Sequence, residues 1–160
     1  MPAHMTRPFI PLFVAFIIAS GLTTSCQWFT STEYVELCND SLRVVDEWTT
    51  LTPVEPFSSS LRCQSILLEP MIPRSVDIEG LSLRLSDGRR VVPDVELIAV
   101  DGSIHRLSNR SMLGSTYYKA DMLGYSGDGL AAGGTFRSVR IRSDLPVTLR
   151  RVVWMCWNPE

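Results

Sequence analysis

Residues 81–107, with the sequence LSLRLSDGRRVVPDVELIAVDGSIHRL, decide the fold class. Apolar and polar residues alternate over residues 81–85, as they do in a β-strand that buries one face. The pairs Asp87-Gly88 and Asp101-Gly102 predict turns, because this dipeptide tolerates the positive φ angles of tight hairpins. Turn signals that recur every ten or so residues between short alternating runs indicate an antiparallel sheet rather than alternating strands and helices.

The same pattern extends along the chain on both sides of this stretch. Further strands are expected at residues 63–68, 117–125, 137–143 and 149–157. The last of these is apolar on both faces after its arginines, so it must be covered on both faces. Segment 27–57, which carries five aromatic side chains, is the expected second cover. The sequence predicts an all-β fold, an antiparallel, jelly-roll-like β-sandwich.

Composition and length are those of one globular domain. The chain has 160 residues, of which 45% are hydrophobic and 20% charged, with a formal net charge of −2. These values exclude a disordered tail and a polybasic nucleic-acid-binding protein. We expect a signal peptide at 1–25, an irregular or partly helical covering segment at 26–60, and the β-sandwich at 61–160, with strands from residue 33 onward as an alternative.

The N-terminal segment has the pattern of an export signal. A run without charge from Phe9 to Ser20 follows Arg7, and small or polar residues come next, as in a secretory signal peptide. The run is interrupted by Pro11 and is shorter than the ~20 residues that a membrane-spanning helix needs. A permanent transmembrane anchor is therefore the weaker interpretation.

Residues 22–26, Leu-Thr-Thr-Ser-Cys, resemble the permissive form of the bacterial lipobox, although Thr23 stands where the commonest lipobox has leucine. The resemblance implies that Cys26 becomes the lipid-bearing first residue of the mature chain, and that Gln27 after it favours sorting to the outer membrane. The alternative is ordinary signal-peptidase cleavage, which leaves Cys26 as a thiol or disulfide partner in a periplasmic or secreted protein.

The cysteines are disulfide candidates before they are metal ligands, because export places them in an oxidising compartment. If Cys26 is lipidated, Cys38, Cys63 and Cys156 remain, and one of them has no partner within the chain. The chain has no CxxC pair, and His105 is the only histidine beyond the export segment. We expect no metal site, since a structural zinc needs more ligands of this kind.

Residues 136–143 and 149–156, joined by a short turn with Pro146, resemble the closing strands of galactose-binding-like β-sandwiches, the discoidin and carbohydrate-binding-module jelly rolls. In many discoidin domains a cysteine at the end of the last strand is bridged to one near the first strand. The resemblance thus implies a Cys63–Cys156 disulfide, with Cys38 as the second choice. Ligand residues of this family lie in variable loops, so none is transferred to this chain.

The sequence weighs against most kinds of catalysis. A Ser-His-Asp mechanism needs a base, and His105 follows the 101–103 turn in a short strand, where a surface or edge-strand histidine is the simpler interpretation. GxSxG, HExxH and Walker motifs are absent. Four acids are candidates for a hydrolase pair: Asp94, Glu96, Asp121 and Asp128. Asp121 and Asp128 are also candidate calcium ligands, but solvated loop acids are more common. We expect no catalytic residue, metal or cofactor.

Charge is unevenly distributed along the chain. Residues 137–151 contain five arginines and one aspartate, whereas residues 33–101 contain thirteen acids and six arginines. This polarity suits self-association or an anionic polymer. The candidate ligand contacts are aromatic and arginine side chains: Arg140, Arg142, Trp157, Tyr117 and Tyr118. Trp154 and Trp157 have opposite parity, so one is expected in the core and the other against a cover or solvent, beside Arg140 and Arg142 in the binding-face hypothesis.

These patterns predict an exported, lipid-anchored, non-catalytic binding domain of the cell envelope, with a glycan or another envelope component as ligand. The alternative is a structural or assembly lipoprotein with a protein partner, which the charge polarity and the two-sided last strand favour. A hydrolase with a carboxylate pair ranks third. No nucleic-acid partner is expected, and the membrane is contacted through the N-terminal lipid.

Overall fold

The computed structural model describes residues 32–58, 60–61, 63–72, 76, 81–110, 121–127 and 134–157. The predicted signal peptide and Cys26 lie outside these ranges. The described residues form strands and no helix, which confirms the all-β prediction. Among them there is accordingly no helix with the length and hydrophobicity to cross a bilayer.

Twelve strands are described: β1 (Thr32–Cys38), β2 (Leu42–Val44), β3 (Thr49–Leu51), β4 (Phe57–Ser58), β5 (Cys63–Pro70), β6 (Leu83–Arg84), β7 (Arg90–Val91), β8 (Asp94–Ala99), β9 (Ile104–Asn109), β10 (Leu123–Ser126), β11 (Thr135–Arg142) and β12 (Val147–Trp157). All their pairings are antiparallel.

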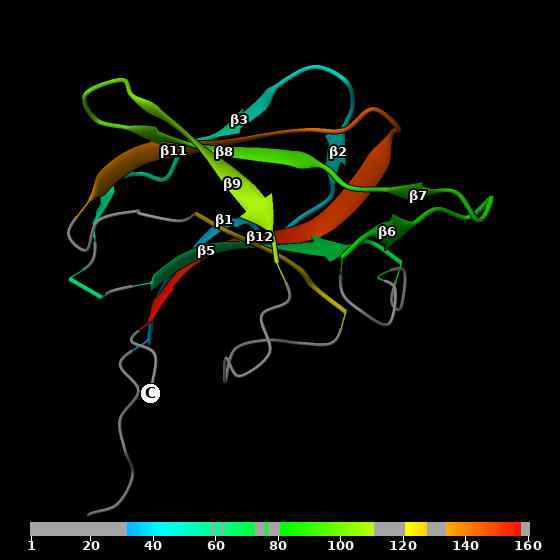
Figure 1. Ribbon diagram of the computed structural model, residues 1–160, viewed down its shortest axis with the longest axis horizontal. Coiled ribbons are helices and arrows are strands. Elements are labelled where there is room, and N and C mark those ends of the chain that lie inside the picture. Colours follow the sequence, from blue (N-terminus) through cyan, green and yellow to red (C-terminus); the bar gives the residue numbers. More distant parts are fainter. Residues whose placement is uncertain are drawn as a thin grey trace, which may run out of the picture.

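Ten of the twelve strands form two layers of one nearly closed sheet (Figure 1), and β6 and β7 form a separate two-stranded sheet. The lower layer has the order β1-β12-β5-β10, with β2 beside the start of β12. The upper layer has the order β9-β8-β11-β3, with β4 beside the start of β11. Strand β9 joins the layers, because it pairs with β8 and, at its end, with β10. The closing strands β11 and β12 lie in different layers, so they do not form a hairpin with each other.

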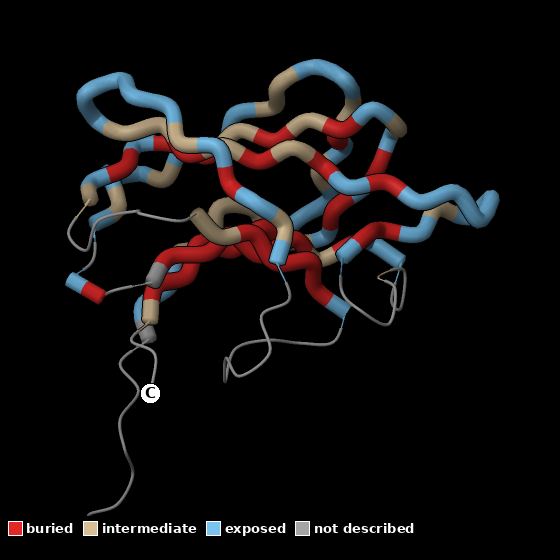
Figure 2. The backbone as a smooth tube through the Cα atoms, viewed as in Figure 1, coloured by how far each residue is buried: buried red, intermediate tan, exposed pale blue. Residues whose placement is uncertain are grey.

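The main core is formed by residues of both layers, and Figure 2 shows buried residues along the strands of each layer. Trp154 of β12 is fully buried there and packs against Phe57, with the ring centroids 4.8 Å apart, and against Phe136 at 5.6 Å. Its indole nitrogen donates a hydrogen bond to Gln64 Oε1 at 3.3 Å. Trp157 lies on the other face of β12, as the opposite parity of the two tryptophans predicts.

A second apolar cluster lies on the outer face of the lower layer. Its members are Leu67, Met122, Val153 and Met155, and Trp157 packs against them. We call these four residues the outer cluster. All four are completely buried, as are their inward-facing neighbours Leu68 and Val152, so β5 and β12 are buried on both faces, as predicted for β12.

The N-terminal segment differs from the expected irregular or helical cover. Its described part forms β1 to β4, in agreement with the alternative of strands from residue 33 onward. Strand β1 runs beside β12 with Tyr34 opposite Met155 and Glu36 opposite Val153. Hydrogen-bonding groups of a sheet edge are satisfied by a neighbouring strand, and the segment therefore extends the sheet instead of lying across it.

Both Asp-Gly pairs form the predicted turns. Gly88 has φ = 83° and Gly102 has φ = 90°, a region that residues with a Cβ rarely adopt. Each turn is closed by hydrogen bonds between the backbones that flank it, Leu85 N to Arg89 O at 2.8 Å and Ala99 N to Ser103 O at 2.9 Å. The first turn shapes the small β6–β7 hairpin, which projects from one end of the molecule (Figure 1).

Candidate functional site

A groove with a volume of about 340 Å³ opens at the end of the molecule from which the β6–β7 hairpin projects. One wall is the hairpin, which continues through β7 toward the upper layer. The other wall belongs to the lower layer, where the end of β5 meets the start of β12 and Met71 N donates to Thr148 O at 2.9 Å. The groove is lined by Pro70, Met71, Ile72, Leu83, Arg84, Leu85, Ser86, Asp87, Arg89, Pro146, Val147 and Thr148.

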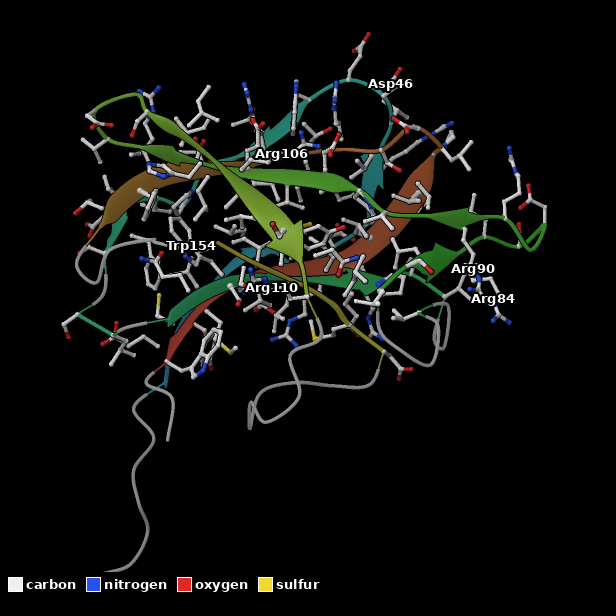
Figure 3. The ribbon with its side chains drawn as sticks, in the orientation of Figure 1. Asp46, Arg84, Arg90, Arg106, Arg110 and Trp154 are labelled. Atoms are coloured by element: carbon white, nitrogen blue, oxygen red, sulfur yellow. The ribbon has the colours of Figure 1, made fainter. Side chains whose placement is uncertain are left out.

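Alternation of apolar and polar residues gives the hairpin its two faces. Leu83 lies opposite Val91, and both are buried in the main core. Arg84 lies opposite Arg90 on the other face, and both are exposed (Figure 3). The base of the hairpin is held to the body by the side-chain amide of Asn109, which donates to the carbonyl of Leu81.

The tip of the hairpin carries a local ion pair. Arg89 Nε donates to Asp87 Oδ2 at 2.7 Å, and the Arg89 backbone nitrogen donates to Asp87 Oδ1 at 3.0 Å. These bonds, the backbone one first, hold the pKa of the Asp87 carboxyl below its ordinary value. Among the described residues, Asp87 is the only acid in the groove lining and Arg84 has no acidic partner.

The rim of the groove leaves large apolar side chains in solvent. Met71 is 49% exposed and Ile72 is 58% exposed. A volume of this size lies in the range of small-molecule sites, about 300–1,000 Å³. With apolar walls and a polar tip, the groove suits a ligand that has an apolar part.

The arginines predicted to contact a ligand lie elsewhere, on the outer face of the upper layer. Arg140 donates from Nε to Glu96 Oε2 at 2.6 Å, and Arg142 donates from Nε to Asp94 Oδ2 at 3.0 Å. Both guanidinium carbons lie over the ring of Trp48, at 4.5 and 4.9 Å from its centroid. The arginines are therefore already engaged by acids and by an aromatic ring.

Trp157 does not join these arginines, which corrects the predicted binding face. It lies on β12 in the lower layer and packs on the outer cluster, whereas Arg140 and Arg142 lie on β11 in the upper layer. Trp48 is the aromatic residue beside them, because Thr49 pairs with Ile141 and places the start of β3 next to β11. Local sequence around Trp48 carries no signal for this long-range pairing. Tyr117 and Tyr118 lie outside the described residues.

Two of the candidate hydrolase acids, Asp94 and Glu96, are held by arginines. Asp94 accepts hydrogen bonds from Arg106 at 2.6 Å and from Arg142, while Glu96 accepts from Arg140. Burial tends to raise the pKa of the Asp94 carboxyl, but the hydrogen bonds from the two arginines bring it below its ordinary value. A carboxyl in this environment stays ionised and is unsuited to general-acid catalysis.

Of the other two acids, only Asp121 lies within the described residues. Asp121 lies exposed in the turn before β10, and Asp128 lies outside the described residues. Within the described ranges, no group of three or more histidine, cysteine, aspartate or glutamate side chains is arranged to hold a metal ion.

His105 lies beside a serine and an aspartate, but in the wrong order for nucleophilic catalysis. Its Nε2 is 3.1 Å from Ser103 Oγ, and this hydroxyl donates to Asp101 Oδ1 at 2.7 Å. In a catalytic triad the carboxylate orients the histidine, whereas here it accepts from the serine. The imidazole also packs edge-on against Phe136, with centroids 5.4 Å apart, which is consistent with a structural role at the start of β9.

The structure does not support the predicted disulfide. Cys38 and Cys156 form no disulfide, and Cys38 Sγ donates to the backbone oxygen of Asp40 at 3.1 Å. In the register of β5 and β12, Cys156 lies opposite Gln64, and Cys63 lies opposite Trp157. Residues directly opposite share a face of the sheet, so the backbone aligns Cys156 with Gln64 rather than with Cys63.

The basic and acidic parts of the sequence form ion pairs with each other in the fold. Four of the five arginines between residues 137 and 151 pair with acids from the acidic part of the chain. These pairs are Arg140–Glu96, Arg142–Asp94, Arg150–Glu69 and Arg151–Glu36 with Glu69.

In comparisons with known proteins, no family model and no curated protein matches the chain.

Proposed function

We propose that this chain is an exported, non-catalytic binding domain of the bacterial cell envelope, and that its ligand occupies the groove beside the β6–β7 hairpin. The observation that carries the proposal is the groove itself, with its apolar walls and its exposed Met71 and Ile72. Exposed apolar side chains that rim a concavity are typical of ligand sites.

The composition of the groove favours an envelope component with an apolar part over a glycan. Sugar sites use aromatic platforms, and none of the described residues that line the groove is aromatic. Two layers of antiparallel strands are compatible with a galactose-binding-like domain. Membership of that family remains part of the proposal and rests on the resemblance of residues 136–156.

Two observations make the assembly-lipoprotein alternative less attractive. The arginines of residues 137–151 that motivated it are mostly paired within the chain. The second argument for this alternative was that the last strand is apolar on both faces. The outer face of β12 is completely buried at Val153 and Met155, so these residues are not available to a partner. The side chains that the hydrolase alternative needs are also engaged within the chain, since Asp94 and Glu96 are bound by arginines.

Ligand retention tests the groove directly. The full chain is incubated with a solubilised envelope extract, repurified and analysed by mass spectrometry for bound molecules. The variant Met71→Ser/Ile72→Ser removes the apolar rim and is expected to lose the retained molecule. The control Val100→Ser/Ile104→Ser changes two residues that are also about half exposed but lie outside the groove lining, and it should retain the molecule. Equal retention by both variants would contradict the proposal.

The export part of the proposal is tested by intact-mass spectrometry of the protein isolated from bacterial cells. Cleavage before Cys26 with added acyl chains is the expected result. An unmodified N-terminus that still contains residues 1–25 would contradict export.

A further inference from the structure

We infer that Tyr34 and Trp157 contact the lipid headgroup region of the anchoring membrane. The domain then stands on the end of the lower layer that carries them and holds the groove away from the bilayer. The inference rests on the proposed function, because it takes Cys26 as the lipid anchor, and it adds the surface that meets the membrane.

Two aromatic side chains lie next to each other on the outer face of the lower layer. Tyr34 of β1 is directly opposite Met155 of β12, and Trp157 is two residues further along β12. Residues directly opposite each other, and residues two apart in a strand, share a face of the sheet, and such diagonal neighbours lie about 7–8 Å apart. We call Tyr34 and Trp157 the aromatic pair.

The aromatic pair is exposed where its neighbours are buried. Tyr34 is 54% exposed and Trp157 is partly exposed, whereas Met155 on the same face is completely buried. Glu36, the next residue of β1 on this face, is paired with Arg151. Tyrosine and tryptophan combine an apolar ring with a polar group, and both are enriched where a membrane meets water. The aromatic pair therefore suits the headgroup region of a bilayer.

The position of the pair agrees with the proposed anchor. Thr32, the first residue of β1, lies opposite Trp157, and Cys26 precedes Thr32 by six residues. A stretch of this length spans at most about 20 Å when it is fully extended. A lipid on Cys26 thus keeps this end of the lower layer within about 20 Å of the bilayer surface.

The groove lies at the opposite end of the same strand. Thr148, near the start of β12, lines the groove, and Trp157 ends the strand. At about 3.3 Å per residue, the two positions are about 30 Å apart. Figure 1 shows the β6–β7 hairpin and the end of β12 on opposite sides of the molecule. A domain that stands on the aromatic pair presents its groove to the aqueous side, so the ligand enters from there.

Paramagnetic relaxation of methionine methyl groups tests the inference. The lipidated protein, purified from bacterial cells, is placed in phosphatidylcholine nanodiscs that contain a lipid with a gadolinium-chelating headgroup. Ser65 lies opposite Met155, and Met71 follows Ser65 by six residues, so Met71 should lie about 20 Å further from the bilayer. The paramagnetic effect falls steeply with distance, and at this spacing we expect it to be about tenfold larger at Met155 than at Met71.

Replacing the aromatic pair should reduce this difference. Tyr34→Ser/Trp157→Ser is expected to lower the ratio about threefold, because the domain then rotates freely on its tether. Trp157 also packs on the outer cluster, so the single variant Tyr34→Ser, at a mostly exposed position, should lower the ratio without disturbing the fold. The control Val100→Ser/Ile104→Ser changes two half-exposed apolar residues beside the β8–β9 turn and should keep the ratio.

The outcomes separate the inference from the proposed function. Equal relaxation of Met71 and Met155 in an acylated protein, or an unchanged ratio in both Tyr34 variants, would overturn the inference alone. If the intact mass shows no acyl chain on Cys26, the anchor and the inference fail together. If the ratio is as expected but no molecule is retained from the envelope extract, the proposed function of the groove fails and the orientation stands.

Discussion

At Tyr125, one buried hydroxyl joins two distant parts of the sheet. The phenol donates to the carbonyl oxygen of Pro93 at 2.6 Å, which links β10 to the start of β8. Burial raises the pKa of the phenol, and the nearby carboxylate of Asp94 raises it further, so the hydroxyl remains a donor. The side chain thus contributes both apolar packing and a specific contact.

Replacement of Tyr125 by Phe should lower the free energy of unfolding by about 1–3 kcal/mol, because the buried carbonyl of Pro93 loses its donor. Urea unfolding measures the loss, and the m value should stay unchanged, since the surface exposed on unfolding is the same. A difference below about 0.5 kcal/mol would show that water or another group replaces the hydroxyl.

Asp94 makes stability depend on pH in the acid range. Its pKa in the folded chain lies below the ordinary value of 3.8, so the folded state favours the carboxylate. The stabilisation is complete above the unfolded pKa and is lost as pH falls through the folded pKa. At pH 7, Asp94→Asn should be about 1 kcal/mol less stable than the unaltered chain, a modest value because the ion pairs are partly exposed.

The measurement is urea unfolding of both proteins between pH 7 and pH 2. The difference between them should stay constant down to about pH 5 and shrink below pH 4. A difference that persists unchanged at pH 2 would contradict the assignment of the effect to the Asp94 carboxylate.

At the scale of elements, β5 is a strand with two buried faces. Leu68 points into the main core and Leu67 points into the outer cluster, and neither has any exposed surface. Successive residues of a strand point to opposite faces, so two apolar layers are needed to bury both. The pattern of residues 149–157 predicted such two-sided burial for β12, and the pairing of β12 with β5 extends it.

Leu67→Ala and Leu68→Ala should each lower the free energy of unfolding by about 2–5 kcal/mol, the range for leucine deletions in well-packed cores. Chemical unfolding measures the free energy of unfolding of both variants. The control is Val54→Ala, at a fully exposed position. If Leu67→Ala behaved like Val54→Ala, the outer face of the lower layer would be open to solvent in solution.

For the whole molecule, the arrangement of charge is a property of the tertiary structure. Acidic and basic residues are segregated along the chain, yet β11 lies beside β8, and β12 lies between β1 and β5. Antiparallel pairing of these strands places Arg140 opposite Glu96 and Arg142 opposite Asp94. Segregation in sequence thus becomes complementarity between neighbouring strands.

A double-mutant cycle on Arg140 and Glu96 measures this complementarity. Glu96→Gln, Arg140→Gln and the double variant should give a coupling free energy of about 0.5–1 kcal/mol. Both side chains are partly buried, Arg140 Nε donates to Glu96 Oε2, and Arg140 Nη2 forms an ion pair with the same oxygen. Thermal or urea unfolding at low and high salt provides the values. Additive effects of the two substitutions would contradict a stabilising pair.

Local pattern was sufficient for the all-β class and for the two Asp-Gly turns. Period-two alternation predicted the all-β class, Asp-Gly pairs predicted the turns at Gly88 and Gly102, and parity separated Trp154 from Trp157. These features depend on residues that are close in the chain, where the side-chain direction and the φ preference of each residue act directly. Strands β2 to β4 have only two or three residues each, and the pattern of segment 32–58 was compatible with a helix, irregular structure or strands.

The neighbours of each strand were decided only by the tertiary structure. The groove combines residues from three separate parts of the chain, and the partner of Arg140 and Arg142 is Trp48 instead of Trp157. Such contacts depend on which strands pair and in which layer they lie. Alternation of apolar and polar residues specifies which face of a strand is buried. Every strand has the same alternation, so the pattern carries no information about the order of the strands in the sheet. By itself, the sequence determined the all-β class and the buried faces of the later strands, while long-range pairing decided the strands of segment 32–58 and what the buried faces meet.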